Sequence, residues 1–313
     1  MIKKPILSIC IPAHGRLEYV INTLESIFSV ENLRNVELSE FEVIISDNDE
    51  KGALKVLSEI FKYPNFKYFQ TDCKGFENSY FVLTYGNGEF LKLHNSQELW
   101  NEGSLFRVIN LIKNNLQKKP LLFFTSGILL KGEIIEVNTF NDFIFKTSYF
   151  TSWSNSFGIW NEDFNKVSID CILNKLFPHT SLLVTQHYKH EFKIVDIPYF
   201  STQFVKKRGG HNKFQAFTVE YPTIVTDLFN KGLITKKTKK RVFRDLLCEY
   251  FPLLYFNVKV SRRETFSSEG FEQNLEIFFP KGSIYLVVFL SFIIPIKIIF
   301  RKIYLNYILK SKD

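Results

Sequence analysis

The sequence predicts an α/β protein with a central, mostly parallel sheet and a helical C-terminal extension. Two stretches, 6–28 and 41–61, carry the prediction: in each, an apolar run rich in β-branched residues leads into a polar turn and then into apolar residues at helical spacing. Repeated strand–turn–helix units are typical of parallel sheets, whose ligands bind at the carboxyl ends of the strands. A third observation is the change near residue 206, after which basic residues predominate.

The remaining elements follow from the same patterns. We expect further strands over 66–69, 88–93, 120–124 and 192–197, with edge strands within 131–150. Helices are expected over 75–83, 100–116, 163–176, 181–188, 216–229 and 236–256. The chain is therefore predicted to comprise an α/β domain, residues 1–205, and a basic helical extension, residues 206–313.

Length and cysteine pattern limit the class of protein. With 313 residues, the chain is too long for one small core. Its four cysteines form no CxxC pair, which favours a reducing cytosol over a disulfide framework or a zinc site: Cys10, Cys73, Cys171 and Cys248. Lys3 and Lys4 are followed at once by Pro5 and a strand, so no signal peptide is predicted.

Charge is unevenly distributed along the chain. Residues 206–313 carry a net charge of +11 and residues 1–205 a net charge of −3, which together give the +8 of the whole chain. A basic segment of this size indicates an anionic partner. Since no nucleic-acid-binding module is recognisable, we do not expect nucleic acid to be that partner.

The last thirty residues favour a membrane surface. The uncharged run 283–296 is shorter than the roughly 20 residues that a spanning helix needs. Lys281 precedes it, and Lys297, Arg301 and Lys302 follow it. This arrangement is typical of a helix lying in an anionic leaflet, which predicts a cytoplasmic protein peripheral to the inner face of the cell membrane. The alternative is a helix buried within the extension.

The two strand-end turns resemble those of the family 2 inverting glycosyltransferases, which have the GT-A fold. Members open with a strand ending in a Pro-Thr-Tyr-Asn-Arg-like turn, here Pro12-Ala-His-Gly-Arg16. Their next strand ends in acidic residues, here Ser46-Asp-Asn-Asp49. The resemblance continues through Gly75 and Asn78 to Gly88-Glu-Phe-Leu-Lys-Leu93, covering the first hundred residues well and the next hundred loosely.

The resemblance implies which residues bind a nucleotide-sugar donor. They lie at the ends of three strands and in the loop before the helix of 75–83: Pro12, Ala13, His14, Arg16, Asp47, Asp49, Gly75, Asn78, His94 and Asn95. Asp47 is the strongest candidate, because an acid at a central strand end can accept a hydrogen bond from a pyrimidine N–H. For Gly75 and Asn78 a glycine turn and a helix-capping role are equally good alternatives.

The sequence departs from the family at the metal-binding motif. Where members have Asp-x-Asp to hold Mg²⁺ or Mn²⁺, this chain reads His94-Asn95-Ser96-Gln97, with Glu98 as the first acid. Since these ions prefer oxygen ligands, we expect a weakened or absent metal site. A softer ion held by His94 and Glu98 is the alternative.

A basic loop is a candidate to replace the metal. The segment Lys206-Lys207-Arg208-Gly-Gly-His211-Asn-Lys213 places cations around two glycines, so it can fold over a donor diphosphate. A solvated basic linker between domains is an equally good interpretation.

Two tryptophans are candidates to contact the acceptor, and one histidine is a candidate catalytic base. Trp153 and Trp160 lie where the family leads into its acceptor site, although each is also a plausible core residue. Members carry a catalytic Asp in the loop before the helix of 181–188, and His179 occupies that place. An unperturbed imidazole suits proton abstraction near neutral pH. A structural histidine is the alternative for His179, and Asp163 and Asp170 are the reserve candidates for the base.

The resemblance implies an enzyme that transfers a hexosyl or related sugar, with inversion, from a nucleotide-sugar to a glycan or lipid-linked acceptor. Surface polysaccharide or lipooligosaccharide assembly is the expected setting. The rival hypothesis is a non-catalytic member that binds a nucleotide-sugar or glycan. The altered Asp-x-Asp motif favours that rival unless His94, the basic loop and His179 compensate for it. A basic nucleic-acid-binding protein is a weaker third hypothesis.

Overall fold

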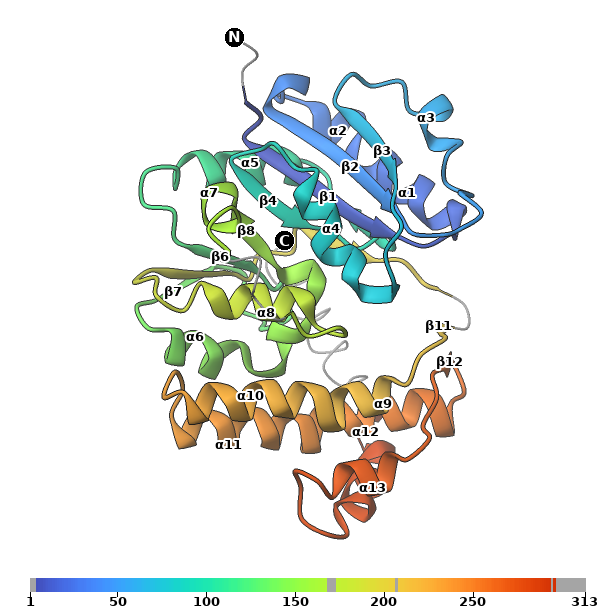
Figure 1. The fold of residues 1–313 in the computed structure, drawn as a ribbon, viewed down its shortest axis with the longest axis vertical. Coiled ribbons are helices and arrows are strands. Elements are labelled where there is room, and N and C mark those ends of the chain that lie inside the picture. The colour runs from blue at the N-terminus through green and yellow to red at the C-terminus, as the bar shows by residue number, and fades with distance from the viewer. Residues whose placement is uncertain (1–3, 168–172, 206–207, 294, 297–313) are drawn as a thin grey trace, which may run out of the picture. The chain divides into compact units, whose positions relative to one another are not determined.

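The computed structural model describes residues 4–167, 173–205, 208–293 and 295–296. The chain folds as two compact units, Met1–Phe204 and Val205–Asp313. Figure 1 shows the elements of both units in chain order. Each unit is described by itself below.

The N-terminal unit is built on a five-stranded sheet with the strand order β3-β2-β1-β4-β8. The first four strands are parallel to one another, and the fifth is antiparallel to its neighbour β4. Their bounds are β1 Leu7–Ala13, β2 Phe41–Asp47, β3 Phe66–Gln70, β4 Phe90–Leu93 and β8 Gly158–Trp160. The predicted α/β class with a mostly parallel central sheet is confirmed.

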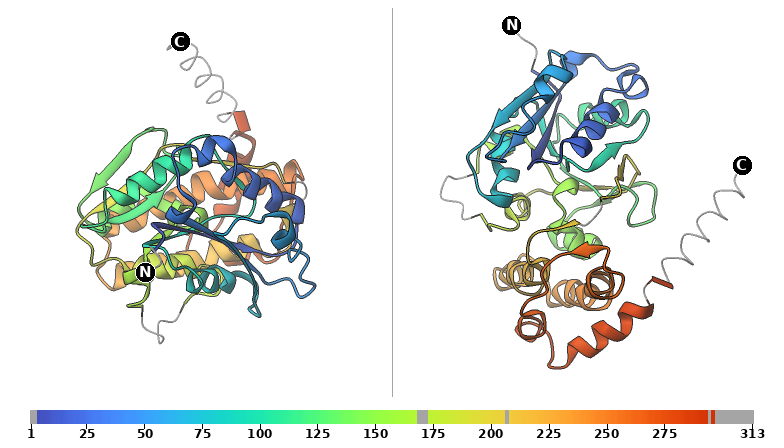
Figure 2. Two further views of the ribbon diagram at one scale, coloured as in Figure 1. Left: turned by 90° about the horizontal axis from the view of Figure 1, so that it is seen from above. Right: turned by 90° about the vertical axis from the view of Figure 1, so that its right-hand side faces the viewer.

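Helices cover both faces of this sheet. Helices α1 (Leu17–Ile27) and α5 (Ser104–Lys113) share one core cluster with β1 and β2, in which Ile9 and Val43 have no exposed surface. Helix α4 (Asn78–Thr84) packs on the opposite face, as the views from two sides show (Figures 1 and 2). Burial on both faces explains why β1 and β2 are continuously apolar instead of alternating.

A second, three-stranded sheet has the order β6-β9-β7, and a two-stranded ribbon pairs β5 with β10. These strands are β5 Glu98–Trp100, β6 Leu121–Phe124, β7 Ile134–Val137, β9 Phe192–Val195 and β10 Phe200–Thr202. The remaining α-helices of the unit are short: α2 Val30–Leu33, α3 Leu57–Ile60, α6 Phe140–Thr147, α7 Asn161–Phe164 and α8 Pro178–Thr185.

Two sequence-based expectations for this unit were wrong. Residues 140–147 form a helix instead of an edge strand, because Phe140, Phe143 and Ile144 follow helical spacing and Thr139 caps the first turn. The helix expected over 163–176 ends at Phe164 in the described part of that range. The strand expected over 192–197 is confirmed as β9, which joins the second sheet.

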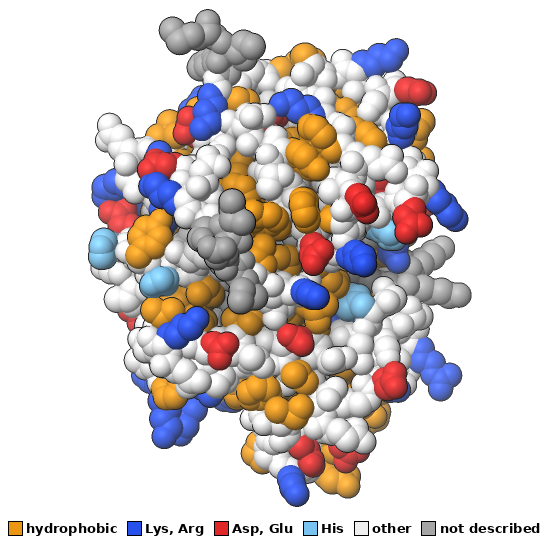
Figure 3. Space-filling model, viewed as in Figure 1, with side chains coloured by type: hydrophobic (Ala, Val, Ile, Leu, Met, Phe, Trp, Pro, Cys, Tyr) orange, Lys and Arg blue, Asp and Glu red, His pale blue; other side chains and the backbone are white. Residues whose placement is uncertain are grey.

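Charged side chains of both signs are interspersed on the face of the molecule in Figure 3. Several are paired on the surface of the N-terminal unit, such as Lys118 with Glu191 at 2.8 Å and Lys193 with Glu136 at 2.9 Å. Exposed pairs of this kind add little to the stability of a fold, because water and salt screen their charges. They are consistent with the near-neutral charge of residues 1–205.

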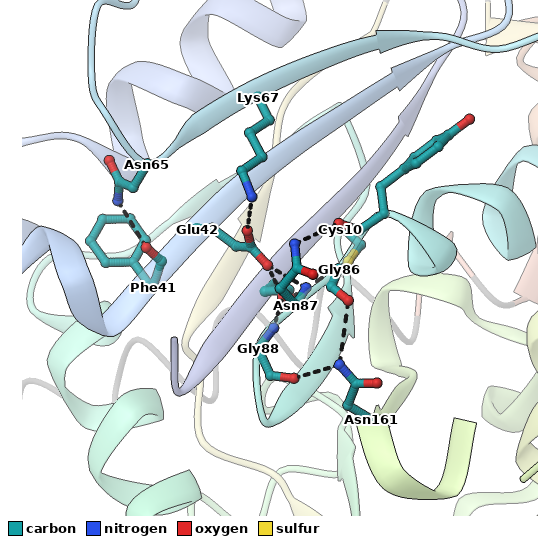
Figure 4. Close-up of polar contacts among 11 residues, drawn as sticks. Cys10, Phe41, Glu42, Asn65, Lys67, Gly86, Asn87, Gly88 and Asn161 are labelled. Atoms are coloured by element: carbon teal, nitrogen blue, oxygen red, sulfur yellow. Dashed lines mark hydrogen bonds and ion pairs between the residues drawn. The ribbon is translucent and has the colours of Figure 1, made fainter. Parts of the chain in front are cut away.

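The buried carboxylate of Glu42 holds the residues that lead into β4 (Figure 4). Glu42 accepts hydrogen bonds from the Ser8 hydroxyl, from the Asn87 N–H and from Lys67 Nζ, each at 2.6 Å. Burial raises the pKa of Glu42, but these donors outweigh it and lower the pKa below its usual range. Gly88 is required here, since a Cβ would lie 2.7 Å from the Ser8 amide.

The C-terminal unit is mainly helical. Its α-helices are α9 Lys213–Gln215, α10 Tyr221–Asn230, α11 Lys236–Asp245, α12 Phe251–Tyr255 and α13 Phe271–Leu275, and its short strands are β11 Arg208–Gly209 and β12 Glu264–Thr265. The structure describes three π-helical turns in this unit, 216–220, 246–250 and 256–260, and the first two end two residues before Pro222 and Pro252. A proline lacks an N–H and displaces the preceding carbonyl, which accounts for the widening of these two turns.

Residues 283–293 form the last described helix. One side of it is buried at Val287 and Ser291, while Tyr285, Phe289 and Phe292 are 76%, 63% and 57% exposed. The exposed residues are four and three positions apart, so they line one stripe of the helix. Within the described residues, no helix is both long and apolar enough to span a membrane.

Candidate functional site

The turns that end β1 and β2 are bonded into one structure. The Asn48 amide donates to the Ala13 carbonyl at 3.2 Å, and the Asn48 side chain donates to the carbonyls of Cys73 and Gly75, both at 3.2 Å. Gly75 has a φ of 53°, a left-handed conformation that favours glycine. The structure therefore brings together the turns that the sequence predicted to bind a donor.

Asn78 links these turns from α4. Its side-chain amide donates to the carbonyls of Ser46 and Ala13, at 2.8 and 3.2 Å, and its carbonyl accepts the Ser46 hydroxyl at 2.6 Å. Both N–H groups are thus used, and the residue is 3% exposed. Asn78 holds β1 and β2 in register at their ends, which is a positioning role and not the donor contact that the resemblance implies.

Asp47 does not present its carboxylate at the surface, contrary to the expectation. It has no exposed area, and its two oxygens accept from the Asp49 amide at 3.0 Å and from the Tyr68 hydroxyl at 3.1 Å. Burial and the neighbouring Asp47 charge raise the pKa of Tyr68 to about 12. Asp47 therefore shapes the turn by fixing Asp49.

Asp49 is the partly exposed acid of this turn. A Cβ added to Gly15 would lie 3.4 Å from its carboxylate, so the two turns are in contact. Gly15 and Arg16 both adopt left-handed backbone, with φ of 58° and 57°, which directs the chain from β1 into α1. His14 and Pro12 belong to the same segment, at or just beyond the end of β1.

His94 is buried beyond the end of β4. It is 1% exposed, its ring packs against those of Trp100 and Phe200 with ring centres 5.6 and 5.3 Å away, and its Nε2 is 3.0 Å from the Glu98 carbonyl. Burial, together with the charge of Lys92, lowers the pKa of His94 to about 3. The imidazole is therefore uncharged near neutral pH, and its Nε2 is hydrogen-bonded to a backbone carbonyl.

The residues at this strand end do not fit a divalent metal. His94 is oriented towards the Glu98 carbonyl, and Asn95 uses its side-chain oxygen to accept from the Gln97 amide at 3.0 Å. Among the residues that the structure describes, no three His, Cys, Asp or Glu side chains lie close enough together to hold a metal ion. No metal-dependent step is derived for this site.

A cavity of about 240 Å³ opens beside these residues, within the N-terminal unit. Its lining residues comprise three aromatic residues, four with hydroxyls, one amide, one acid, a glycine and an isoleucine: Phe124, Trp153, Phe200, Thr125, Ser126, Ser156, Thr202, Asn155, Glu98, Gly127 and Ile128. The Asn155 side chain accepts from the Asn95 amide at 3.2 Å, which ties the cavity wall to the end of β4. Aromatic faces with polar groups around them suit a sugar ring.

Lys92 lies against the wall of this cavity and was missed by the sequence analysis. The residue is fully buried, and Nζ lies 5.1 and 4.8 Å from the ring centres of Phe124 and Phe200. Nζ donates to the backbone carbonyls of Leu93, at 2.6 Å, and Asn155. Burial lowers the pKa of Lys92 to about 7, against the opposing effect of the Glu98 charge. A lysine within an otherwise apolar strand was the available signal.

The two tryptophans have different roles. Trp153 is partly exposed and lines the cavity, as an acceptor-contacting residue would. Trp160 is fully buried on β8, packs on Phe90 with ring centres 5.0 Å apart and donates its indole N–H to the Pro120 carbonyl at 2.7 Å. Trp160 is a core residue in this structure, so its assignment to the acceptor site is corrected.

His179 is not the unperturbed imidazole that the sequence analysis assumed. It is 5% exposed in the first turn of α8, and its Nε2 is 2.8 Å from the Ser152 carbonyl. Nε2 must carry the proton to bond a carbonyl, so the hydrogen bond fixes the tautomer. Burial lowers the pKa of His179 to about 4. The geometry matches the structural alternative, in which His179 joins α8 to the segment before Trp153.

The reserve base Asp163 is not among the residues that line the cavity. Asp163 is bound by the Tyr188 hydroxyl at 2.9 Å and paired with Lys189 at 2.7 Å, on residues distinct from the cavity lining. Asp170 lies outside the described residues.

The basic loop belongs to the C-terminal unit. Lys206 and Lys207 lie outside the described residues, and the backbone of Arg208 pairs with Glu264 through β11 and β12. The His211 ring packs edge-on against Phe266, with ring centres 4.9 Å apart. The role of the basic loop over a donor diphosphate stays a prediction.

Comparison with known proteins identifies the N-terminal part of the chain. Residues 8–117 match the family model described as Glycosyl transferase family 2. This stretch contains β1, β2, β4 and the turns described above. The resemblance inferred from the sequence is thereby confirmed. No curated protein sequence matches the chain.

Solved structures similar to this one include S. aureus TarS. Residues 1–349 of that protein in complex with UDP-GlcNAc match with a TM-score of 0.58 and 15% identity, over 87% of this chain and 80% of that chain. The complex of the same residues with UDP matches with a TM-score of 0.55 and 17% identity, over 90% of this chain and 82% of that chain. A longer S. aureus TarS structure matches with a TM-score of 0.54 and 15% identity, and the match covers 81% of this chain but only 45% of that one. At such identities the likeness establishes the fold.

Proposed function

We propose that the chain transfers a hexosyl or related sugar, with inversion, from a nucleotide-sugar to a glycan or lipid-linked acceptor, since residues 8–117 match the model of glycosyl transferase family 2. The observation that carries the proposal is the joined pair of turns at the ends of β1 and β2, with the cavity next to the end of β4. In the order β2-β1-β4, these features follow one another along the carboxyl edge of one sheet.

Different parts of the substrate can be assigned to different places along this edge of the sheet. We assign the nucleoside to the turns at residues 12–16 and 47–49, where Asp49 offers a partly exposed carboxylate to a base N–H. We assign one sugar ring to the cavity, since about 240 Å³ lies below the roughly 300–1,000 Å³ typical of larger ligands. The TarS complexes with UDP-GlcNAc and UDP support a donor of the nucleotide-sugar class.

A thermal-shift screen tests donor recognition. We expect one of the uridine, thymidine, guanosine or cytidine diphosphates to raise the Tm of the full chain, and to do so in EDTA as well, because the residues after β4 do not fit a divalent metal. At a hundredfold excess over Kd, binding adds about 2.7 kcal/mol of stability. Stabilisation that requires Mn²⁺ would contradict the metal-independent part of the proposal.

We further propose that residues from about 281 onward attach the protein to an anionic membrane surface, in keeping with a lipid-linked acceptor. The support is the exposed stripe Tyr285, Phe289 and Phe292 on the helix of 283–293, together with the basic residues that follow in the sequence. Aromatic side chains on one helix face and cations nearby are typical of helices lying in the interface.

Vesicle flotation tests this attachment. Phe289→Glu combined with Phe292→Glu should reduce binding of the full chain to phosphatidylserine-containing vesicles at least about tenfold. Each phenylalanine side chain that enters the lipid contributes about 1.5–3 kcal/mol to binding, and the substitutions remove that contribution. Ile277→Glu is the matched control, since Ile277 is 58% exposed but lies outside the stripe. Equal flotation of all three proteins would show that the stripe does not contact lipid.

A further inference from the structure

One wall of the cavity beside β4 is a short irregular segment, residues 153–156. It contributes three of the lining residues, Trp153, Asn155 and Ser156. Two of its backbone amides bond locally: the Trp153 amide donates to the Phe150 carbonyl at 2.9 Å, and the Ser156 amide donates to the Trp153 carbonyl at 3.1 Å. Because the segment precedes β8 and belongs to no sheet, its position depends on bonds to neighbouring elements.

Lys92 supplies such a bond from β4. Its Nζ donates to the Asn155 carbonyl and, at 2.6 Å, to the Leu93 carbonyl. The side chain is fully buried, and the ring centres of Phe124 and Phe200 lie 5.1 and 4.8 Å from Nζ, so water does not compete for the two carbonyls. The two bonds need two N–H groups, which a lysine amine carries whether or not it is protonated.

Two further hydrogen bonds connect the same stretches of chain. The Asn95 amide donates to the Asn155 side-chain oxygen at 3.2 Å, and the Leu93 amide donates to the Phe157 carbonyl at 3.1 Å. These two bonds involve either a wall residue's own side chain or backbone groups alone. The bond from Lys92 is therefore the connection that a substitution can remove without changing a residue that lines the cavity.

We propose that Lys92 is a positioning residue for the acceptor: by holding residues 153–156 against β4, it fixes the wall against which the acceptor sugar binds. This inference rests on the proposed glycosyltransferase function and adds to it a residue that, being fully buried, contacts neither substrate. The nucleoside is assigned to the turns at residues 12–16 and 47–49, whereas the wall carries the partly exposed Trp153. Loosening the wall should therefore affect the acceptor and not the nucleotide.

Lys92→Met tests the proposal, because methionine fills a similar volume but has no N–H to donate. We expect kcat/KM for an octyl glycoside acceptor to fall roughly ten- to a hundredfold through a higher KM, as a misplacement of about 1 Å would cause, with the nucleoside diphosphate Kd within about threefold of wild type. Lys92→Gln serves the same test if Lys92→Met does not fold, since its amide nitrogen ends one bond short of Nζ.

Val108→Ala is the matched control for a loss of stability. Val108 is fully buried on α5 and does not line the cavity, so its truncation should lower the Tm but leave the acceptor KM unchanged.

Acrylamide quenching of tryptophan fluorescence gives a readout that needs no turnover. The chain has three tryptophans, of which Trp100 and Trp160 are 3% and 0% exposed, so the quencher reaches mainly Trp153 on the wall. Lys92→Met should be quenched more strongly than the wild type, because the released wall exposes Trp153, while Val108→Ala should be quenched like the wild type.

The outcomes separate this inference from the proposed function. If the wild type transfers sugar and Lys92→Met keeps the wild-type acceptor KM and quenching, the positioning role is wrong and the proposed function stands. A higher KM for the nucleotide-sugar in place of the acceptor would show that the wall holds the donor, and an equal effect in Val108→Ala would show a loss of stability alone. Either result contradicts the inference. A wild type that transfers no sugar overturns the proposed function and, with it, the acceptor role of Lys92.

Discussion

Asp49→Asn is expected to weaken the binding of nucleoside diphosphate by roughly ten- to a hundredfold, the effect of losing one hydrogen bond to a charged group. Asp49 is the partly exposed acid where β1 and β2 end, and it lies against Gly15 of the neighbouring turn. An amide has the same shape but carries no charge. Isothermal titration with the nucleotide identified in the thermal-shift screen measures the change.

Two further variants make the result specific. Glu50→Gln removes a charge from the adjacent, exposed residue and should bind like wild type. Asp47→Asn should mainly lower the Tm without ligand, because Asp47 is fully buried and accepts from Tyr68 and from the Asp49 amide. Equal affinity of Asp49→Asn and wild type would remove Asp49 from the donor site.

The second large effect is a loss of stability in mild acid. Burial lowers the pKa of His94 to about 3 and that of His179 to about 4, whereas an unfolded chain titrates its histidines near 6.5. Below pH 6.5 the unfolded state therefore binds more protons than the folded state, and stability falls as the pH falls towards the folded-state values. At pH 5 the cost is about 2 kcal/mol for each histidine.

Thermal unfolding at pH 7 and pH 5 measures this effect. Together the two histidines should lower the Tm by roughly 10 °C over that range. His179→Gln keeps an N–H for the Ser152 carbonyl but cannot titrate, so its Tm should fall less than that of wild type, while the exposed His190→Gln should behave like wild type. Identical losses in all three proteins would mean that His179 is protonated in the folded state.

The central sheet could be predicted because its strands carry their own signals. β1 and β2 are apolar, β-branched and followed by polar turns, and their helices repeat apolar residues every three or four positions. The partners of β9 could not be predicted, because pairing with β6 and β7 joins residues about 60–70 positions apart. Residues 140–147 were misassigned because the capping Thr139 was overlooked.

The candidate site was predictable only in outline. Sequence motifs located the turns around Asp47 and the altered metal motif at His94, but not which of these side chains are buried. Burial decided the roles of Asp47, Asn78 and His179, because each of these side chains is hydrogen-bonded to neighbouring residues inside the fold. Lys92 escaped notice because it lies inside a strand, where its contact with the cavity depends on Phe124 and Phe200 from distant strands.

Turnover tests the central claim most directly. The full chain is incubated with UDP-, dTDP-, GDP- and CMP-sugars, with octyl glycosides as acceptors, and both the released nucleotide and the glycosylated acceptor are quantified. We predict that one donor class yields the two products in equal amounts, with inverted anomeric configuration, and that EDTA does not abolish the reaction. Nucleotide binding without any acceptor-dependent release would contradict the account and identify a non-catalytic binding protein.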